Sequence, residues 1–246
     1  MSRTFEMLQH LEKDQELTLS PSRVALAPPV KAEHNGAKAV RVGDEEVLKL
    51  VQRIFRTAGT EAPRLVVFSG VGHGDGATWI STSVATTLAA QSTASICVVD
   101  ANLRTPSLHN FFDIENRVGW ADAISQPGTL RTFAQQIAGS NLWVLTSGSP
   151  ESAGALSSEG LRTRMADLRA EFDYVLIDAP PANLYADAIS LGRLSDGIIL
   201  VLQSNTTRRE AALKAKESFE AANVRLLGAV LNKRTFPIPQ NLYDRL

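Results

Sequence analysis

The sequence predicts an α/β domain in which a parallel β-sheet is covered by helices on both faces. Two observations predict it: short, continuous apolar runs alternate along the chain with longer stretches whose apolar residues recur at helical spacing. The expected strands cover residues 65–68, 96–99, 142–145, 174–177, 197–202 and 226–231. The expected helices cover residues 44–57, 78–90, 161–172 and 208–222. In such a sheet, ligands bind where the carboxyl ends of the strands open into loops.

The composition of the 246-residue chain fits one globular domain with an N-terminal extension, since 44% of the residues are apolar and 21% are charged. A formal net charge of -1 gives no electrostatic basis for nucleic-acid binding. The one cysteine, Cys97, lies in an apolar run, which indicates a buried strand position and excludes a disulfide framework. The apolar runs are too short to cross a bilayer and the first residues do not resemble a signal peptide, so we expect a cytoplasmic protein.

Four segments are expected along the chain. Residues 1–17 have apolar side chains at helical spacing among charges, which predicts a short amphipathic helix. That helix could pack on its own domain or dock on a partner or a membrane surface, although its acidic residues disfavour anionic lipid. Residues 18–42 contain many helix-breaking residues and predict a flexible linker. The folded domain is expected at 43–235, and a loose tail at 236–246.

A glycine-rich loop at residues 69–79 directly follows the first predicted strand and precedes a predicted helix. Glycines allow backbone N–H groups to turn inward around an anion, and the helix N-terminus adds its dipole. This context is typical of a phosphate-binding P-loop, although a glycine-rich turn without a ligand would show the same composition. The residues expected to line a nucleotide phosphate site are Gly72, Gly74, Asp75, Gly76, Ala77, Thr78 and Trp79.

The loop departs from the P-loop motif at Ala77, where the motif has lysine. That lysine brings a positive charge to the β- and γ-phosphates, and the methyl group of alanine cannot replace it. Losing one preorganised charged donor typically costs about 10²- to 10³-fold in rate. Thr78 keeps the hydroxyl that ligates Mg²⁺ in such loops, and backbone N–H groups can still bind phosphate. Nucleotide binding is therefore expected to survive better than phosphoryl transfer.

Two further loops place polar side chains at the ends of predicted strands. Asp100 ends the strand at 96–99 and is suited to holding metal-bound water, or alternatively to capping the loop or helix that follows. Asn102, two residues on, has the shape of aspartate but no charge. Asp178 ends the apolar run 174–177 in the manner of a Walker B aspartate, which holds Mg²⁺ through water. We therefore expect a catalytic centre at Asp100, Asn102 and Asp178, and a Mg²⁺ site at Thr78, Asp100 and Asp178.

Together, the three loops resemble those of the bacterial tyrosine kinases of capsule and exopolysaccharide biosynthesis (BY-kinases), which belong with ParA and MinD to the deviant-Walker P-loop ATPases. The loop at 74–78 is similar to Gly-Glu-Gly-Lys-Ser, that at 100–106 to Asp-x-Asp-x-Arg-x-Pro, and that at 172–181 to Phe-Asp-x-(apolar)₃-Asp-Thr-Pro-Pro. The resemblance extends to Leu-Gly-x-Val-Leu-Asn at 227–232. It implies a P-loop NTPase-like fold, ATP or ADP with Mg²⁺ as ligands, and contact between Asn232 and the adenine.

The chain departs from the family pattern at four places. Ala77 replaces the lysine, and Asn102 replaces the second aspartate of its motif. The helix expected at 44–57 lacks the Glu-x-x-Arg-x-x-Arg sequence of the family's oligomerisation helix. The tail has one tyrosine, Tyr243, where active members have a tyrosine-rich tail that is phosphorylated in trans. Arg104 follows the second strand and could supply the missing positive charge.

The resemblance and these departures predict a regulatory, BY-kinase-like P-loop protein of exopolysaccharide biosynthesis in which phosphoryl transfer is impaired or absent. One alternative is an active protein-tyrosine autokinase that uses Mg-ATP. A further alternative is a ParA- or MinD-like positioning ATPase, which is disfavoured because the early loop positions Gly70, Val71 and Gly72 include no lysine. The resemblance also implies a membrane polysaccharide co-polymerase or another assembly protein as partner, homo-oligomers, no nucleic acid, and a place in the cytoplasm or at the inner face of the plasma membrane.

Overall fold

The structure, a computed structural model, describes three ranges of the chain: 45–55, 62–148 and 158–234. The amphipathic helix expected at 1–17, the linker at 18–42 and the tail at 236–246 lie outside the described residues. Within the described ranges, no helix is both long enough and apolar enough to cross a membrane.

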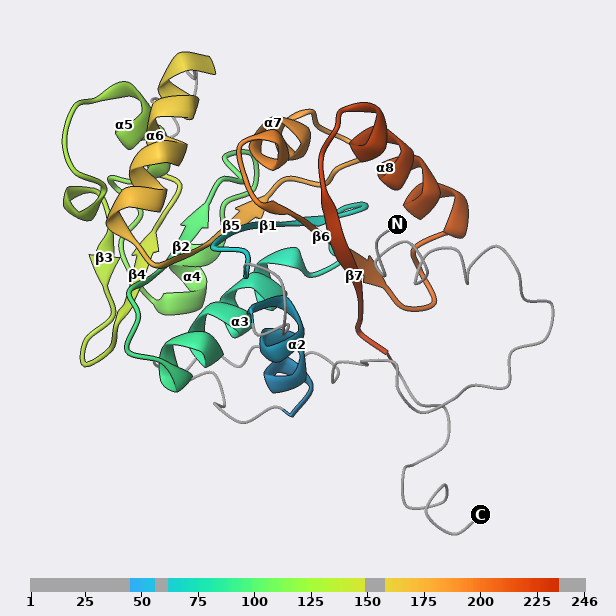
Figure 1. Ribbon diagram of the computed structural model, residues 1–246, viewed down its shortest axis with the longest axis horizontal. Coiled ribbons are helices and arrows are strands. Elements are labelled where there is room, and N and C mark those ends of the chain that lie inside the picture. The colour runs from blue at the N-terminus through green and yellow to red at the C-terminus, as the bar shows by residue number, and fades with distance from the viewer. Residues whose placement is uncertain (1–44, 56–61, 149–157, 235–246) are drawn as a thin grey trace, which may run out of the picture.

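A seven-stranded sheet forms the centre of the fold (Figure 1), with the strand order β3-β4-β2-β5-β1-β6-β7. In chain order the strands are β1 (Leu65–Gly70), β2 (Ile96–Asp100), β3 (Gln135–Gln136), β4 (Leu142–Leu145), β5 (Tyr174–Ala179), β6 (Gly197–Gln203) and β7 (Leu226–Asn232). Every pairing is parallel except that of the short edge strand β3 with β4. The predicted parallel α/β fold is confirmed, and the antiparallel edge is an addition that the apolar pattern does not predict.

Helices cover both faces of the sheet, as expected (Figure 1). One face packs against α2 (Glu45–Phe55), α3 (Ala77–Gln91) and α4 (Leu108–Phe112). The other packs against α5 (Trp120–Ser125), α6 (Ser158–Glu171), α7 (Asp187–Arg193) and α8 (Arg209–Ala221). A 3₁₀ turn, η1 (Leu130–Thr132), precedes β3. The predicted helices differ from the observed ones by at most three residues, at the start of α6, while α4, α5 and α7 were not predicted.

Each face of the sheet has its own apolar core because successive strand side chains point to opposite faces. In β1, Val66 and Phe68 face α2 and α3, whereas Leu65 and Val67 face the helices on the other side. All four side chains are fully buried. Burying a side chain of this size contributes roughly 1.5–3 kcal/mol. The continuous apolar runs in the sequence therefore mark strands that are covered on both faces.

The strand order brings the polar strand ends together. β1 lies between β5 and β6, so the chain continues from β1 to β2 on one side and later reaches β6 and β7 on the other. Ligand sites of open α/β sheets lie at the carboxyl ends of the strands, where the strand order reverses in this way. β2 and β5 are neighbours, and Asp100 stands opposite Asp178 in their register. The loops after β1, β2 and β5 therefore meet at one edge.

Candidate nucleotide-binding site

The P-loop, residues 70–78, joins β1 to α3 at this edge. Gly74 and Gly76 have φ angles of 81° and 92°, which lie in the left-handed region that favours glycine. A Cβ atom at Gly76 would also collide with the side-chain amide of Asn232. The backbone path therefore requires glycine at both positions, and it turns the chain sharply into the N-terminus of α3. The first N–H groups of a 15-residue helix point along its axis and are suited to binding an anion.

Asp75 holds the P-loop to the protein from within. Its side chain is 4% exposed; Oδ2 accepts the Gly72 N–H at 2.8 Å and Oδ1 accepts the hydroxyl of Thr207 at 3.2 Å. Thr207 lies in the loop after β6, and its own oxygen accepts the N–H of Gln203 at 2.8 Å. Asp75 therefore links the P-loop to the end of a neighbouring strand. It also engages the Gly72 N–H, while the Val71 N–H bonds to the carbonyl oxygen of Val201, so the N–H groups that can face a phosphate are those later in the loop.

The end of β7 holds the P-loop from another side. The side chain of Asn232 is 3% exposed, and its Nδ2 donates to the carbonyl oxygen of Asp75 at 2.9 Å while its Oδ1 accepts the Lys233 N–H at 2.8 Å. The next residue, Lys233, donates from Nζ to the carbonyl oxygen of Gly74 at 2.6 Å. Asn232 thus bonds to the loop backbone, and its contact with adenine stays a prediction that depends on the resemblance.

The expected magnesium side chains lie together at the mouth of the sheet. The hydroxyl of Thr78 donates to Asp178 Oδ2 at 2.6 Å, and the hydroxyl of Ser107 donates to Thr78 Oγ1 at 3.3 Å. Asp100 stands beside Asp178 on the adjacent strand. The structure therefore brings the P-loop hydroxyl and both carboxylates to one place, as the sequence predicts.

Asp178 has an environment that suits a cation. Its carboxyl group is fully buried, and the Oδ1 atom has no hydrogen-bond partner within the described part of the chain. Burial and the neighbouring charge of Asp100 raise the pKa of Asp178 well above its ordinary value, although the Thr78 hydroxyl opposes the shift. A buried carboxylate oxygen without a partner is costly, and a divalent cation would satisfy it. Thr78 and Asp178 therefore fit Mg²⁺, which prefers oxygen ligands.

Asp100 is bonded differently from Asp178. Oδ2 accepts the N–H groups of Ser107 and Leu108 at 2.9 and 3.0 Å, and Oδ1 accepts the N–H of Asn102 at 3.2 Å. Burial raises the pKa of Asp100, while these three N–H groups oppose the shift. Asp100 therefore caps the loop that leads into α4, which is the alternative role that the sequence leaves open for it.

Asn102 and Trp79 lie near the site but bond or pack elsewhere. The amide of Asn102 donates to Thr105 Oγ1 at 3.0 Å and accepts the Thr105 N–H at 3.3 Å, which closes its own turn. Trp79 is half-buried on α3 and packs against the apolar cluster beneath α2. No direct contact joins either side chain to Asp178 among the described hydrogen bonds, so their catalytic and nucleotide-binding roles stay predictions.

Ala77 begins α3, and its methyl group packs against the same apolar cluster. Arg104, the cation considered as a replacement for lysine, is directed toward α7. Its guanidinium lies 3.4 Å from Asp187 Oδ2 and 4.3 Å above the ring of Tyr185. His73 of the P-loop also contacts Tyr185, edge to face at 6.1 Å between ring centroids. The positive charge of Arg104 is thus partly compensated by Asp187 at the rim.

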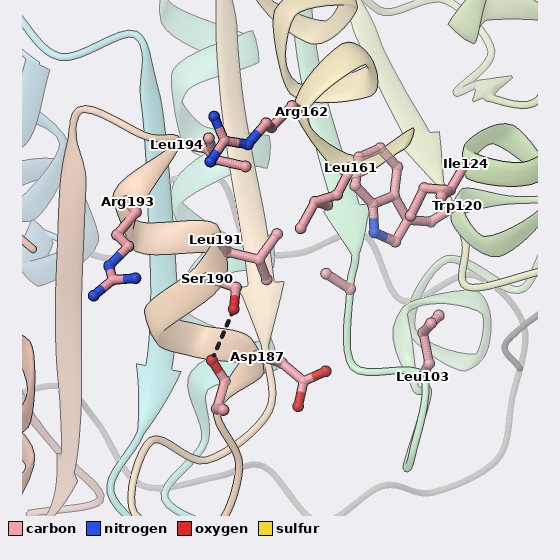
Figure 2. Close-up of a pocket in the computed structure, with 12 residues that line it drawn as sticks. Leu103, Trp120, Ile124, Leu161, Arg162, Asp187, Ser190, Leu191, Arg193 and Leu194 are labelled. Carbon is pink, nitrogen blue, oxygen red and sulfur yellow. Dashed lines mark hydrogen bonds between the residues drawn. The ribbon is translucent and has the colours of Figure 1, made fainter. Parts of the chain in front are cut away.

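A cavity of about 430 Å³ lies on the face of the sheet that α5, α6 and α7 cover (Figure 2). It is lined by residues of α5, α6, α7 and the loop after β2, and it includes no residue of the P-loop. Figure 2 shows apolar side chains at its centre and Asp187, Arg162 and Arg193 at its margins. Asp187 lines this cavity and also contacts Arg104, which lies in the loop after β2.

Three residues at the site were not predicted from the sequence: Ser107, Thr207 and Lys233. Ser107 follows the Arg-x-Pro end of the second motif, and Lys233 directly follows Asn232, so their positions next to motif residues were available signals. Thr207 bonds to Asp75 across 132 residues of sequence, and no local pattern marks it. The site is therefore held together by polar side chains from four loops.

The sequence of this chain is similar to those of several known proteins. The sequence model of the ParA family, described as NUBPL iron-transfer P-loop NTPase, matches residues 62–243. Tyrosine-protein kinase YwqD of Bacillus subtilis (strain 168) is 34% identical over 169 residues, which cover 68% of this chain and 71% of that protein. The putative tyrosine-protein kinase CapB of Staphylococcus aureus is 30% identical over 190 residues, which cover 76% of this chain and 82% of that protein.

A solved structure gives the same result for the fold. The crystal structure of the chimerical protein CapA2B2 superposes on this chain with a TM-score of 0.71 at 26% identity. The superposition covers 78% of this chain and 85% of the CapA2B2 chain. P-loop NTPases of this kind bind nucleotide and Mg²⁺ in general. The matched residues span the P-loop, both aspartate loops and the end of β7. The chain therefore belongs to the bacterial tyrosine kinase family, within the ParA-type P-loop NTPases.

Proposed function

We propose that this protein is a nucleotide-binding, regulatory member of the bacterial tyrosine kinases, in which phosphoryl transfer is impaired or absent. One observation carries the proposal: Ala77 stands where the family has lysine, inside a P-loop whose glycines, threonine and facing aspartates are in place. Removing one charged donor of this kind costs about 10²- to 10³-fold in rate. The backbone N–H groups and the helix N-terminus can still bind phosphate without that lysine.

Within this proposal, Thr78 and Asp178 hold Mg²⁺ and the P-loop amides hold the phosphates of ATP or ADP. When bound, the metal would neutralise negative charge on the phosphates. Asp100 keeps the loop after β2 in place and adds negative charge beside Asp178. Asn102 provides no charge, and its amide bonds to Thr105. Nucleotide occupancy, rather than turnover, is then the property that a partner protein would detect.

The proposed setting is the cytoplasmic side of an exopolysaccharide assembly system. The resemblance supports a membrane polysaccharide co-polymerase or another assembly protein as partner, and self-association into homo-oligomers. YwqD is named a tyrosine-protein kinase and CapB a putative tyrosine-protein kinase. A position in the cytoplasm or at the inner face of the plasma membrane follows from that setting.

An active protein-tyrosine autokinase is the second candidate, and the contact between Thr78 and Asp178 favours it. The Thr78 hydroxyl and the Asp178 carboxylate, 2.6 Å apart, are the side chains that would hold Mg²⁺ for transfer from ATP. A ParA- or MinD-like positioning ATPase is not favoured, because the early loop positions Gly70, Val71 and Gly72 include no lysine.

Incorporation of radioactive γ-phosphate from ATP into tyrosine separates the two candidates. We expect the full chain to incorporate no more phosphate than its Asp178→Asn variant, which removes the magnesium-facing charge. Clear incorporation that the Asp178→Asn variant loses would establish the autokinase instead. Calorimetry with ADP and ATP, with and without Mg²⁺, tests binding separately, and we expect binding that Mg²⁺ strengthens.

A further inference from the structure

The residue after β7 carries a positive charge onto the P-loop. Lys233 has φ of 56°, in the left-handed region that non-glycine residues seldom adopt. This turn directs its side chain back to the P-loop, where Nζ donates to the carbonyl oxygen of Gly74 at 2.6 Å. The preceding residue, Asn232, bonds to the carbonyl oxygen of Asp75. Asn232, the last residue of β7, and Lys233 after it thus bond to two successive carbonyl oxygens of the P-loop.

The site has a deficit of positive charge that Lys233 could relieve. Asp75, Asp100 and Asp178 are all buried at this edge, and Ala77 contributes no compensating charge. A phosphate chain would add further negative charge to this environment. Opposite charges attract each other more strongly at a protein surface than in bulk water, because the effective dielectric constant is lower there. An ammonium group at the P-loop would therefore raise the affinity for nucleotide.

Lys233 contacts the P-loop directly, whereas Arg104 bonds elsewhere. The guanidinium of Arg104 lies 3.4 Å from Asp187 and stacks on Tyr185, so its charge is already partly compensated by a carboxylate. The ammonium of Lys233 bonds to a neutral carbonyl oxygen, and it keeps two further N–H donors. Its four-carbon stem is flexible, which lets the ammonium pivot while the backbone stays fixed.

We propose that Lys233 is a phosphate-binding residue, which supplies from the end of β7 the positive charge that Ala77 does not supply from the P-loop. The ligand class is a nucleoside di- or triphosphate bound with Mg²⁺. This inference rests on the proposed nucleotide-binding function and assigns it a residue. Lys233 strengthens phosphate binding, whereas the P-loop position that holds lysine in the family is still occupied by Ala77.

The test measures ADP affinity by calorimetry in the presence of Mg²⁺ for the full chain and its variants. We expect Lys233→Met to weaken ADP binding about 10- to 100-fold, the size of a lost charge-assisted hydrogen bond. Lys233→Arg should restore most of the affinity, because it returns the charge. Lys214→Met, at an exposed lysine of α8, is the matched control and should leave affinity unchanged.

A double-mutant cycle separates charge from structural support. In an Ala77→Lys background, which returns lysine to the P-loop, Lys233→Met should weaken ADP binding less than about threefold, because the two charges serve the same phosphates. An equal loss in both backgrounds, together with a lower melting temperature, would overturn the proposal in favour of a purely structural role. If Lys233→Met binds ADP as well as the unaltered chain does, this inference alone fails. If the unaltered chain binds no ADP, the proposed function fails as well.

Discussion

The ends of β2 and β5 carry the same side chain in opposite situations. Asp100 and Asp178 stand opposite each other in the register of two adjacent strands. Asp100 accepts three backbone N–H groups, whereas Asp178 accepts one hydroxyl and has a buried oxygen with no partner in the described residues. Both pKa values are raised, and that of Asp178 is raised further above its ordinary value.

The difference separates a framework residue from a ligand-facing one. The protein itself stabilises the charge of Asp100, since backbone N–H groups point at both of its oxygens. Asp178 lacks this support, so its charge costs free energy until a cation arrives. A buried polar atom without a partner is costly, and proteins keep such atoms mainly where function needs them. Side-chain type and strand position alone do not distinguish the two roles, whereas their hydrogen bonds do.

The largest expected effect tests the framework role. Replacing Asp100 by Ala leaves the N–H groups of Asn102, Ser107 and Leu108 without their acceptor. Leaving three partly buried donors unsatisfied should lower the free energy of unfolding by about 4 kcal/mol. Urea denaturation at neutral pH measures it. A loss below about 1 kcal/mol would show that the loop finds other partners, and the contrast between the two aspartates would then disappear.

The next effect is smaller and has the opposite sign. Asp178→Asn removes the buried charge but keeps an acceptor for the Thr78 hydroxyl. A carboxyl group whose pKa is raised by folding stabilises the fold while protonated; this contribution is full below its ordinary value of 3.8 and is lost as pH rises through the raised pKa. The variant should therefore be more stable than the native chain by about 1–2 kcal/mol at pH 8.

Two measurements complete this test. Urea denaturation at a series of pH values should show the stability advantage of Asp178→Asn shrinking as pH falls, because the native carboxyl group then becomes protonated. The variant should also lose the Mg²⁺-dependent part of its ADP affinity. A variant that is less stable than the native chain at pH 8 would mean that Asp178 is a second framework residue.

Much of the fold is predictable because β1, β2 and β5 are covered on both faces and so appear as continuous apolar runs. The short helices are not predictable in this way. α5 has six residues, too few to show helical periodicity, and it is held by hydrogen bonds to the residues after β4 and to α6. There the buried guanidinium of Arg164 donates to the carbonyl oxygens of Ala123, Gln126 and Gly128.

The positions of the site residues are predictable for a related reason. Parallel strands end at the same edge, so three loops that each follow a strand must meet there. Their bonding is set by distant partners instead: Lys233 reaches Gly74 across 159 residues of sequence. Whether an aspartate accepts backbone N–H groups likewise depends on the path of the loop that follows it. The positions of Asp100 and Asp178 therefore follow from the sequence, whereas their different roles depend on hydrogen bonds that form only in the folded chain.

A third aspartate, at the opposite end of the strands, provides the smallest expected effect. Burial disfavours the charge of Asp196, but hydrogen bonds from Arg169 and from the N–H groups of Leu65 and Arg64 outweigh it and lower its pKa. Its stabilising contribution is present above its ordinary pKa of 3.8 and is lost as pH falls through the lowered value. Because the carboxylate is partly exposed, Asp196→Asn should cost about 0.5–1 kcal/mol at pH 7, and less in acid. Urea denaturation at pH 7 and at acid pH measures this change, with Glu217→Gln on the exposed face of α8 as a control that should leave stability unchanged.

The pH dependence of stability at Asp196 is opposite to that at Asp178, because partners in the protein stabilise the charge of Asp196 and burial opposes the charge of Asp178. An Asp196→Asn variant that gained stability relative to the native chain as pH rose would contradict this difference between the two aspartates.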